Sequence, residues 1–190
     1  MNEIMMNEVE RPLTALEVRA QVNLIQEVMK AVMQEGTHYG KIPGCPAPSL
    51  WKPGAEKLLS TFHVATEVEV EDLSTDDEAR YRVKEKAVAR DGRIIGVGVG
   101  ECSSMEDKYK WRKMVCQEEF DATPEDRRRV KWSKWDNKVT EVKQIRTQKA
   151  DIANTILKMA DKRAYVALAL KVTAASDIFT QDLEDMQPEV

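Results

Sequence analysis

Residues 79–101, ARYRVKEKAVARDGRIIGVGVGE, constrain the fold more than any other segment. Side chains alternate on both sides of Asp91-Gly92, a dipeptide typical of tight turns, and this pattern predicts a β-hairpin. A two-residue loop would place Lys84 opposite Val99 and mix polar and apolar residues on both faces. A three-residue loop with Gly92 left-handed shifts the pairing by one residue and leaves one face mostly apolar, so we predict that register. Its apolar face would pair Val83 with Val99, Glu85 with Val97 and Ala87 with Ile95.

The other face of this hairpin would combine three cations with three glycines. In the predicted register, Arg82, Lys84 and Lys86 lie opposite Gly100, Gly98 and Gly96. Glycines in a strand often mark the close approach of a ligand or of another backbone. Two interpretations stay open: a basic surface that a ligand approaches, or a solvated face whose glycines admit a packed helix.

The rest of the chain predicts helices at both ends. Thr14 and Glu17 form a capping-box pattern for an amphipathic helix over residues 15–35, which Gly36 ends. A last helix is expected from about Lys149 to Val172. Its predicted inner stripe consists of Ile152, Ile156, Ala160, Ala164 and Ala167.

Between these helices we expect an irregular loop over residues 36–54, a short helix over 54–62 and a strand over 63–73. The expected fold class is α+β: an N-terminal helix and an antiparallel sheet with a basic hairpin, packed on a long C-terminal helix. We expect a single domain over residues 1–190, with a charged insertion at 105–148, the long helix at 149–175 and an acidic tail at 176–190.

Charge is segregated along the sequence. The net charge is −4, and residues 64–79 contain seven acids. Residues 127–149 contain nine Lys and Arg against Asp136 and Glu141, a net charge of 9 − 2 = +7. Such a basic stripe can attract a polyanion although the whole molecule is acidic. The alternative is a set of solvated charges without a partner.

Other features narrow the class of protein. Three scattered cysteines form no disulfide framework and suit a reducing cytoplasm. No apolar run approaches the roughly 20 residues of a membrane span. His38 and His63 lack a second ligand at metal-site spacing, so we expect no cofactor and no metal.

The insertion carries tryptophans among its cations. Trp111, Trp132 and Trp135 alternate with Lys and Arg, a composition that suits a surface which stacks bases and neutralises phosphates. The alternative is a small satellite core. Glu141 and Lys143 partly match a metal-dependent nuclease motif, although no strand is expected around them.

Cations also mark the middle of the last helix. Arg163 falls at the edge of the predicted inner stripe, whereas Lys158 and Lys162 point elsewhere. A partly buried guanidinium needs a partner. That partner is either Glu85 on the inner face of the hairpin or the phosphate of a bound nucleic acid.

Three segments resemble the phage and prophage single-strand annealing proteins, and more distantly the annealing domain of eukaryotic recombination mediators. They are LWKPGAEKLLSTF, GVGVGECSS and NTILKMADKRAYVALAL…ASDIFTQDLED, and the resemblance covers about residues 36–104 and 149–185. It implies a β-β-β-α core, rings or helical filaments, and a basic groove for single-stranded DNA. It also implies that the mediators' basic pair falls on Lys162 and Arg163. Similar phage sequences often carry paired cysteines of a zinc ribbon, but this chain has only Cys116 in that region.

The expected function is therefore ATP-independent binding and annealing of single-stranded DNA in phage recombination, without catalysis. Expected partners are single-stranded DNA, further copies of the chain, and a phage exonuclease or host single-strand-binding protein, in the cytoplasm of a bacterial host. Two alternatives are a metal-dependent nuclease and a phage protein-interaction module that acts on a host factor. The predicted DNA-binding residues are Lys162, Arg163, Lys158, Arg82, Lys84, Lys86, Lys52, Trp111, Arg112, Trp132 and Trp135. We expect the hairpin cations and the helix cations to line one common trough.

Overall fold

The computed structural model describes residues 12–42, 45, 47–89, 91–135 and 138–179, apart from the side chains of Lys134 and Trp135. The elements in chain order are α1 (Ala15–Val32), β1 (Tyr39–Gly40), β2 (Ser49–Leu50), α2 (Lys52–Thr61), β3 (Ala65–Asp72), β4 (Arg80–Val88), β5 (Ile94–Ser103), α3 (Asp107–Lys110), β6 (Trp111–Lys113), α4 (Gln117–Ala122), the 3-10 turn η1 (Glu125–Arg127), β7 (Arg128–Trp135), β8 (Lys138–Arg146) and α5 (Lys149–Thr173). The predicted α+β class is confirmed. Within the described residues, none of the helices combines the length and apolar content that a membrane span requires.

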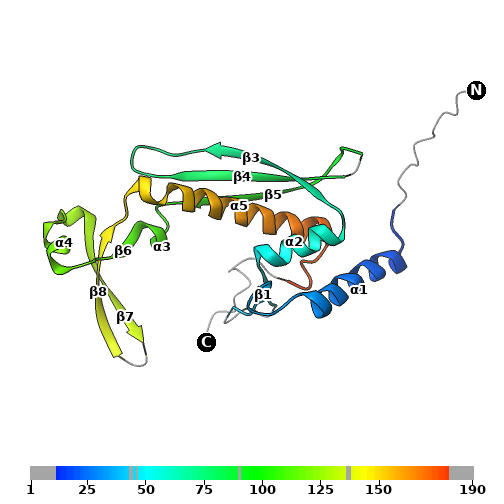
Figure 1. Ribbon diagram of the computed structural model, residues 1–190, viewed down its shortest axis with the longest axis horizontal. Coiled ribbons are helices and arrows are strands. Elements are labelled where there is room, and N and C mark those ends of the chain that lie inside the picture. Colours follow the sequence, from blue (N-terminus) through cyan, green and yellow to red (C-terminus); the bar gives the residue numbers. More distant parts are fainter. Residues whose placement is uncertain (1–11, 43–44, 46, 90, 136–137, 180–190) are drawn as a thin grey trace, which may run out of the picture.

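The centre of the molecule is a three-stranded antiparallel sheet, in the order β3-β4-β5, with α5 lying across one face (Figure 1). Helix α5 packs against β5 and β4, and α2 lies on the side of α5 away from the sheet. The chain therefore runs β-β-β through the sheet, then through a second lobe, and returns as the covering helix.

Gly96, Gly98 and Gly100 of β5 allow α5 to pack directly against the strand; we call them the glycine floor. A Cβ atom on Gly98 would lie 2.5 Å from the backbone nitrogen of Leu168, and one on Gly100 would collide with backbone atoms of Ala160 and Ala164. Because real Cβ atoms do not approach backbone so closely, the helix sits directly on the strand backbone. Of the predicted inner stripe, Ile156, Ala160 and Ala164 are fully buried here.

The predicted turn is correct but the predicted hairpin register is wrong. Ala89 and Arg93 are hydrogen-bonded across the turn and Gly92 has a φ of 85°, as a three-residue loop requires; Arg90 lies outside the described residues. A β-bulge between Val88 and Ala87 then shifts the pairing by one residue, so that Val83 pairs with Gly100 and Lys84 with Val99.

The physical reason for this register is the helix. The glycines must face α5, since no other residue allows the close approach, and they share that inner face with Val83, Glu85 and Ala87. Val97 and Val99 are turned to the outer face of the sheet beside the cations. Contact between the helix and the strand backbone therefore outweighs the burial of two valines.

The N-terminal part of the chain builds a second region of core. The capping box of Thr14 and Glu17 is confirmed, and α1 ends at Val32 rather than at Gly36. Ile25 and Met33 pack with Leu58 and Leu59 of α2 and with the C-terminal half of α5. This core lies on the α5 side of the sheet. Phe179, from the region expected as an acidic tail, is also buried in it; residues 180–190 lie outside the described residues.

Residues 107–146 form a separate lobe with its own sheet, in the order β6-β8-β7, and the β7–β8 ribbon projects from the body (Figure 1). The expectation of no strand around Glu141 is wrong, because Glu141 lies within β8. The strands of this lobe are too polar to show the regular apolar alternation that reveals a half-buried strand, so the sequence does not predict them.

We predict that Gly98→Ala destabilises the protein by about 3 kcal/mol or more, because the added methyl group must push α5 off the sheet. The free energy of unfolding from denaturant titration measures this effect. Val97→Ala is the matched control on the same strand. Its side chain is partly exposed on the outer face, so we expect a change below about 1 kcal/mol. Equal effects of the two substitutions would contradict the proposed role of the glycine floor.

Candidate nucleic-acid interface

One face of the three-stranded sheet of the second lobe carries five cations. Side chains alternate between the faces of a strand, and directly paired residues share a face. The pairs Lys113–Gln144, Arg129–Gln144 and Trp111–Arg146 therefore place these side chains together. We call this surface the cationic ribbon face; its cations are Lys113, Arg129, Lys131, Lys138 and Arg146.

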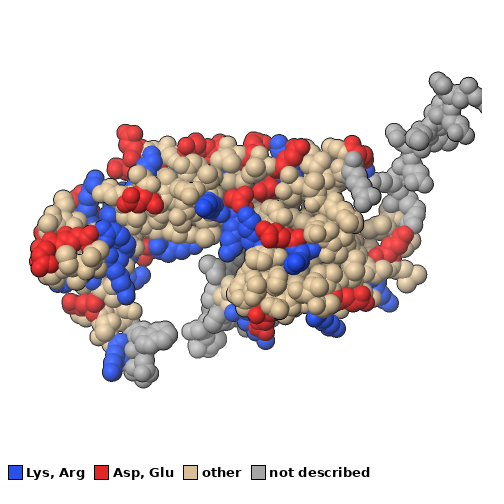
Figure 2. Space-filling view, in the orientation of Figure 1, with Lys and Arg blue, Asp and Glu red and all other residues tan. Residues whose placement is uncertain are grey.

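Few carboxylates neutralise the cationic ribbon face. Arg129 and Lys131 share the carboxylate of Asp107, at 3.0 and 3.4 Å. Lys113 and Lys138 have no ion-pair partner within the described part of the chain. Arg146 donates instead to the carbonyl oxygen of residue 77. In Figure 2, Lys and Arg gather on this lobe and border the hollow between it and the body.

The tryptophans do not share one surface as predicted. Trp111 belongs to the cationic ribbon face, where the guanidinium of Arg129 lies 4.5 Å from its ring centre and the ammonium of Lys110 lies 5.6 Å from it. Trp132 pairs with Glu141 on the opposite face and is 64% exposed. The side chain of Trp135 lies outside the described residues. Trp111 is therefore already covered by cations, whereas Trp132 is free for contact.

On the opposite face of the lobe, α4 packs against β8. Phe120 of α4 lies under Arg128 and Lys143, and Arg112 pairs with Glu119 at 2.6 Å. Arg112 was predicted to bind DNA, but it lies on this opposite face and is held by a carboxylate.

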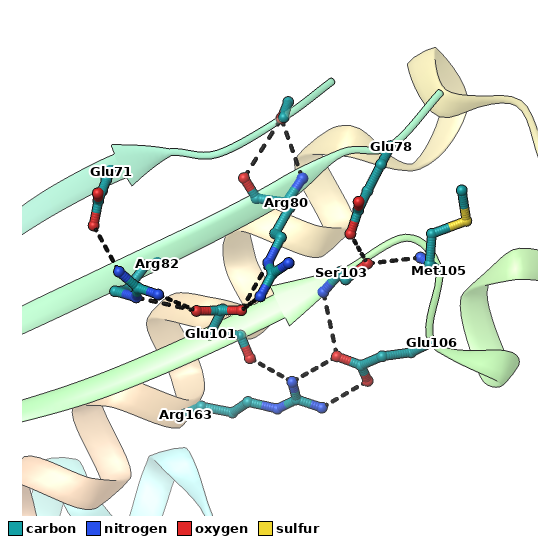
Figure 3. A network of polar contacts seen from close by, with 10 residues as sticks. Glu71, Glu78, Arg80, Arg82, Glu101, Ser103, Met105, Glu106 and Arg163 are labelled. Atoms are coloured by element: carbon teal, nitrogen blue, oxygen red, sulfur yellow. Dashed lines mark hydrogen bonds and ion pairs between the residues drawn. The ribbon is translucent and has the colours of Figure 1, made fainter. Parts of the chain in front are cut away.

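The three hairpin cations lie on the outer face of the main sheet, where they are paired. Lys84 and Lys86 both reach Glu69, at 3.3 and 2.9 Å. Arg82 bridges Glu71 and Glu101 (Figure 3). The acids of residues 64–79 thus include the direct partners of the basic strand, which explains part of the charge segregation in the sequence.

Arg163 links α5 to the turn that leads into the second lobe. Its guanidinium donates to both carboxylate oxygens of Glu106, at 2.7 and 2.8 Å, and to the carbonyl oxygen of Glu101 (Figure 3). The alternative partner predicted from the sequence, Glu85, is wrong. The hydrogen bonds from Arg163 lower the pKa of Glu106 to about 2.

The other helix cations occupy a different side of α5. Lys158 and Lys162 are exposed, and each lies about 200° around the helix from a buried alanine that faces the sheet. Lys52 binds Asp161 at 2.8 Å and lies over the ring of Tyr165. Because α5 and the sheet separate Lys158 and Lys162 from Arg82, Lys84 and Lys86, the predicted common trough does not exist within one chain.

Glu85 is the one buried carboxyl group of the main sheet in the described structure. It is 3% exposed on the inner face, and its Oε2 has no hydrogen-bond partner among the described residues. Burial and the nearby carboxylate of Asp161 raise the pKa of Glu85 to about 7. Among the described residues, no three His, Cys, Asp or Glu side chains are grouped closely enough to hold a metal ion.

Comparisons with protein-family models, with curated proteins and with solved structures found no match. The resemblance to annealing proteins therefore rests on the three sequence segments alone.

We predict that Arg163→Ala lowers the free energy of unfolding by about 2 kcal/mol, because the Glu106 carboxylate loses its partner in a partly exposed site. Lys162→Ala is the adjacent control and should leave stability unchanged. The folded-state pKa of Glu106 is below its usual 4.5, so this contribution is present above pH 4.5 and is lost as pH falls toward 2. Chemical denaturation of both variants at pH 7 measures the difference; equal stabilities would contradict the structural role of Arg163.

A second prediction concerns Glu85. Its folded-state pKa lies above the usual 4.5, so the native state holds a proton that the unfolded chain releases. Stability should therefore fall by up to about 3 kcal/mol as pH rises from about 4.5 to 7. Glu85→Gln should remove this slope, and denaturant titrations between pH 5 and 8 test it. An unchanged slope in the variant would show that Glu85 is not the group responsible.

Proposed function

We propose that this chain binds single-stranded DNA along the cationic ribbon face and anneals complementary strands without ATP. The observation that carries the proposal is the charge of that face: five cations on one side of a projecting sheet, with Asp107 as their one ion-pairing carboxylate in the described structure. Side chains of this kind neutralise phosphates and leave the base edges free.

The shape of the lobe suits an extended strand. β8 has nine residues, so the face is roughly 30 Å long, which is several nucleotides of backbone. Contacts of this kind are electrostatic and individually weak. They allow a bound strand to shift until its bases find their complement, and base pairing then supplies the free energy of annealing.

The arrangement of the body agrees with what the resemblance implies. Strands β3, β4 and β5 followed by α5 form a β-β-β-α arrangement, and the second lobe is inserted before the helix. The resemblance also leads us to propose a role in phage homologous recombination and self-assembly of the chain. The resemblance points to the hairpin and α5 for DNA contact. The hairpin cations are paired with carboxylates, whereas Lys113 and Lys138 of the ribbon have no ion-pair partner among the described residues. This favours the ribbon over the hairpin.

We predict that Lys113→Ala with Lys138→Ala weakens the binding of labelled oligothymidine at least tenfold at low salt, because these two cations of the face have no ion-pair partner among the described residues. Removing two phosphate contacts should also reduce the slope of log K against log salt by about 1.4. Fluorescence anisotropy measures both quantities. Lys84→Ala with Lys86→Ala is the matched control, because both lysines already bind Glu69.

Two results would contradict the proposal. In the first, the hairpin variant loses binding and the ribbon variant retains it. In the second, the wild-type chain fails to accelerate the pairing of complementary oligonucleotides in the absence of ATP. Cleavage of labelled DNA with Mg²⁺ or Mn²⁺ would favour the nuclease alternative built on Glu141 and Lys143.

A further inference from the structure

The sequence that follows Phe179 carries only negative charge. Residues 180–190, which we call the acidic segment, lie outside the described residues and contain no Lys or Arg. Their acids are Asp182, Glu184, Asp185 and Glu189, a net charge of −4. Phe179 itself is buried, and its ring centre lies 6.0 Å from that of Tyr39. The acidic segment therefore starts from a fixed place on the body.

The cationic ribbon face has the opposite charge. Its five cations against the carboxylate of Asp107 leave a net charge of 5 − 1 = +4 in the described structure. Lys113 and Lys138 have no ion-pair partner among the described residues, and Arg146 donates only to uncharged groups there. Single exposed ion pairs contribute little, but several charges on one surface act together. The face and the acidic segment are therefore matched in charge.

The cations of the body offer the acidic segment less. The hairpin cations are paired with carboxylates of β3 and β5, and Lys52 is paired with Asp161. Lys158 and Lys162 are exposed on α5, but they supply only two charges. Among these surfaces, the cationic ribbon face has the most positive charge that no carboxylate neutralises.

The acidic segment is long enough to reach the second lobe. Phe179 packs with the C-terminal half of α5, whereas the lobe joins the other end of this helix at Lys149. A helix of 25 residues spans roughly 36 Å. The 11 residues of the segment span up to about 38 Å when extended.

The start of the acidic segment and the ribbon also lie on the same side of the molecule. Phe179 packs on Tyr39 of β1, and in Figure 1 both β1 and the β7–β8 ribbon lie below α5. The hollow between lobe and body, which Lys and Arg border, opens on that side (Figure 2). The segment can therefore reach the face without passing around α5 or the main sheet.

We propose that the acidic segment binds the cationic ribbon face of its own chain and competes there with single-stranded DNA. The carboxylates then occupy the cations that phosphates would contact. Because the segment is tethered to the same molecule, its effective concentration at the face is high. A strand must make several contacts at once to displace it, so the segment disfavours short or weak encounters. The contact itself needs no DNA, whereas its role as a competitor rests on the proposed function.

Carbodiimide cross-linking tests the contact in the full chain without DNA, since this reagent joins a carboxylate to an amine that it touches. We expect mass spectrometry to find links from the acidic segment to Lys113, Lys131 or Lys138. A mixture of ¹⁵N-labelled and unlabelled chains shows whether each link lies within one chain. Absence of links to the ribbon, links mainly to Lys158 or Lys162, or links mainly between differently labelled chains would each overturn the proposal.

The competition is tested by fluorescence anisotropy with labelled oligothymidine. Glu184→Gln with Asp185→Asn removes half of the segment's charge, so we expect this variant to bind at least about threefold more tightly at low salt. The gain should shrink as salt is added, because screening also weakens the contact in the wild type. Glu27→Gln with Glu35→Gln is the matched control. It removes the same charge from exposed positions on and after α1 and should bind like the wild type.

The outcomes separate this proposal from the proposed function. Unchanged DNA affinity of the acidic-segment variant, or an equal gain in the control variant, would overturn the competition, since the second result is an effect of net charge alone. A chain that forms the cross-links but binds no DNA would contradict the proposed function and support the contact. A chain that binds DNA through the ribbon but forms no cross-links would contradict the contact and leave the proposed function intact.

Discussion

Direct contact between α5 and the backbone of β5 is the constraint on which the rest of the structure depends. Glycines at every second position of β5 remove the side chains that would hold the helix away. Because α5 packs on the glycines, the hairpin face that carries them is buried. The cations, Val97 and Val99 then lie on the outer face. The position of every charged group on the sheet follows from this packing.

Polar contacts then connect the packed layers. Arg163 binds Glu106 directly after β5, so the middle of α5 holds the start of the second lobe. Lys52 binds Asp161 and ties α2 to the same helix. Arg163 and Lys52, which the sequence predicts to bind DNA, therefore hold elements of the fold together. A guanidinium at the edge of a buried stripe is well suited to this task, since it makes several hydrogen bonds at once.

Local signals in the sequence predicted the fold well, and long-range pairing limited the rest. The capping box, the Asp91-Gly92 turn and the long last helix depend on neighbouring residues, and all three are present. The predicted register is wrong because a one-residue bulge has no local signature here. It is also wrong because the apolar pattern favours a buried face with the valines, whereas the packed helix requires the glycines there. The partner of Arg163 was missed for a related reason, since it lies in a turn 57 residues away.

The candidate site, like the fold, could be predicted from local signals but not where it depends on strand pairing. Composition alone located the basic stripe of residues 127–149, but only the strand pairing of β6, β7 and β8 separates the cationic ribbon face from the face that carries Trp132 and Arg112. Hydropathy does not show which side chains of a polar strand share a face, because the residues of both faces are polar. The sequence could therefore identify the right segment without telling its two sides apart.

The position of the cationic ribbon face affects how the protein is oriented as it approaches a charged molecule. An acidic protein with its positive charge concentrated on a projecting arm is an electric dipole. At low ionic strength, the field of a polyanion should turn the molecule arm-first before any contact forms. At physiological salt the Debye length is about 8 Å, so this orienting force acts only over the last nanometre of approach. Projection of the arm beyond the acidic body then matters as much as its charge, because it keeps the repelling carboxylates outside that range.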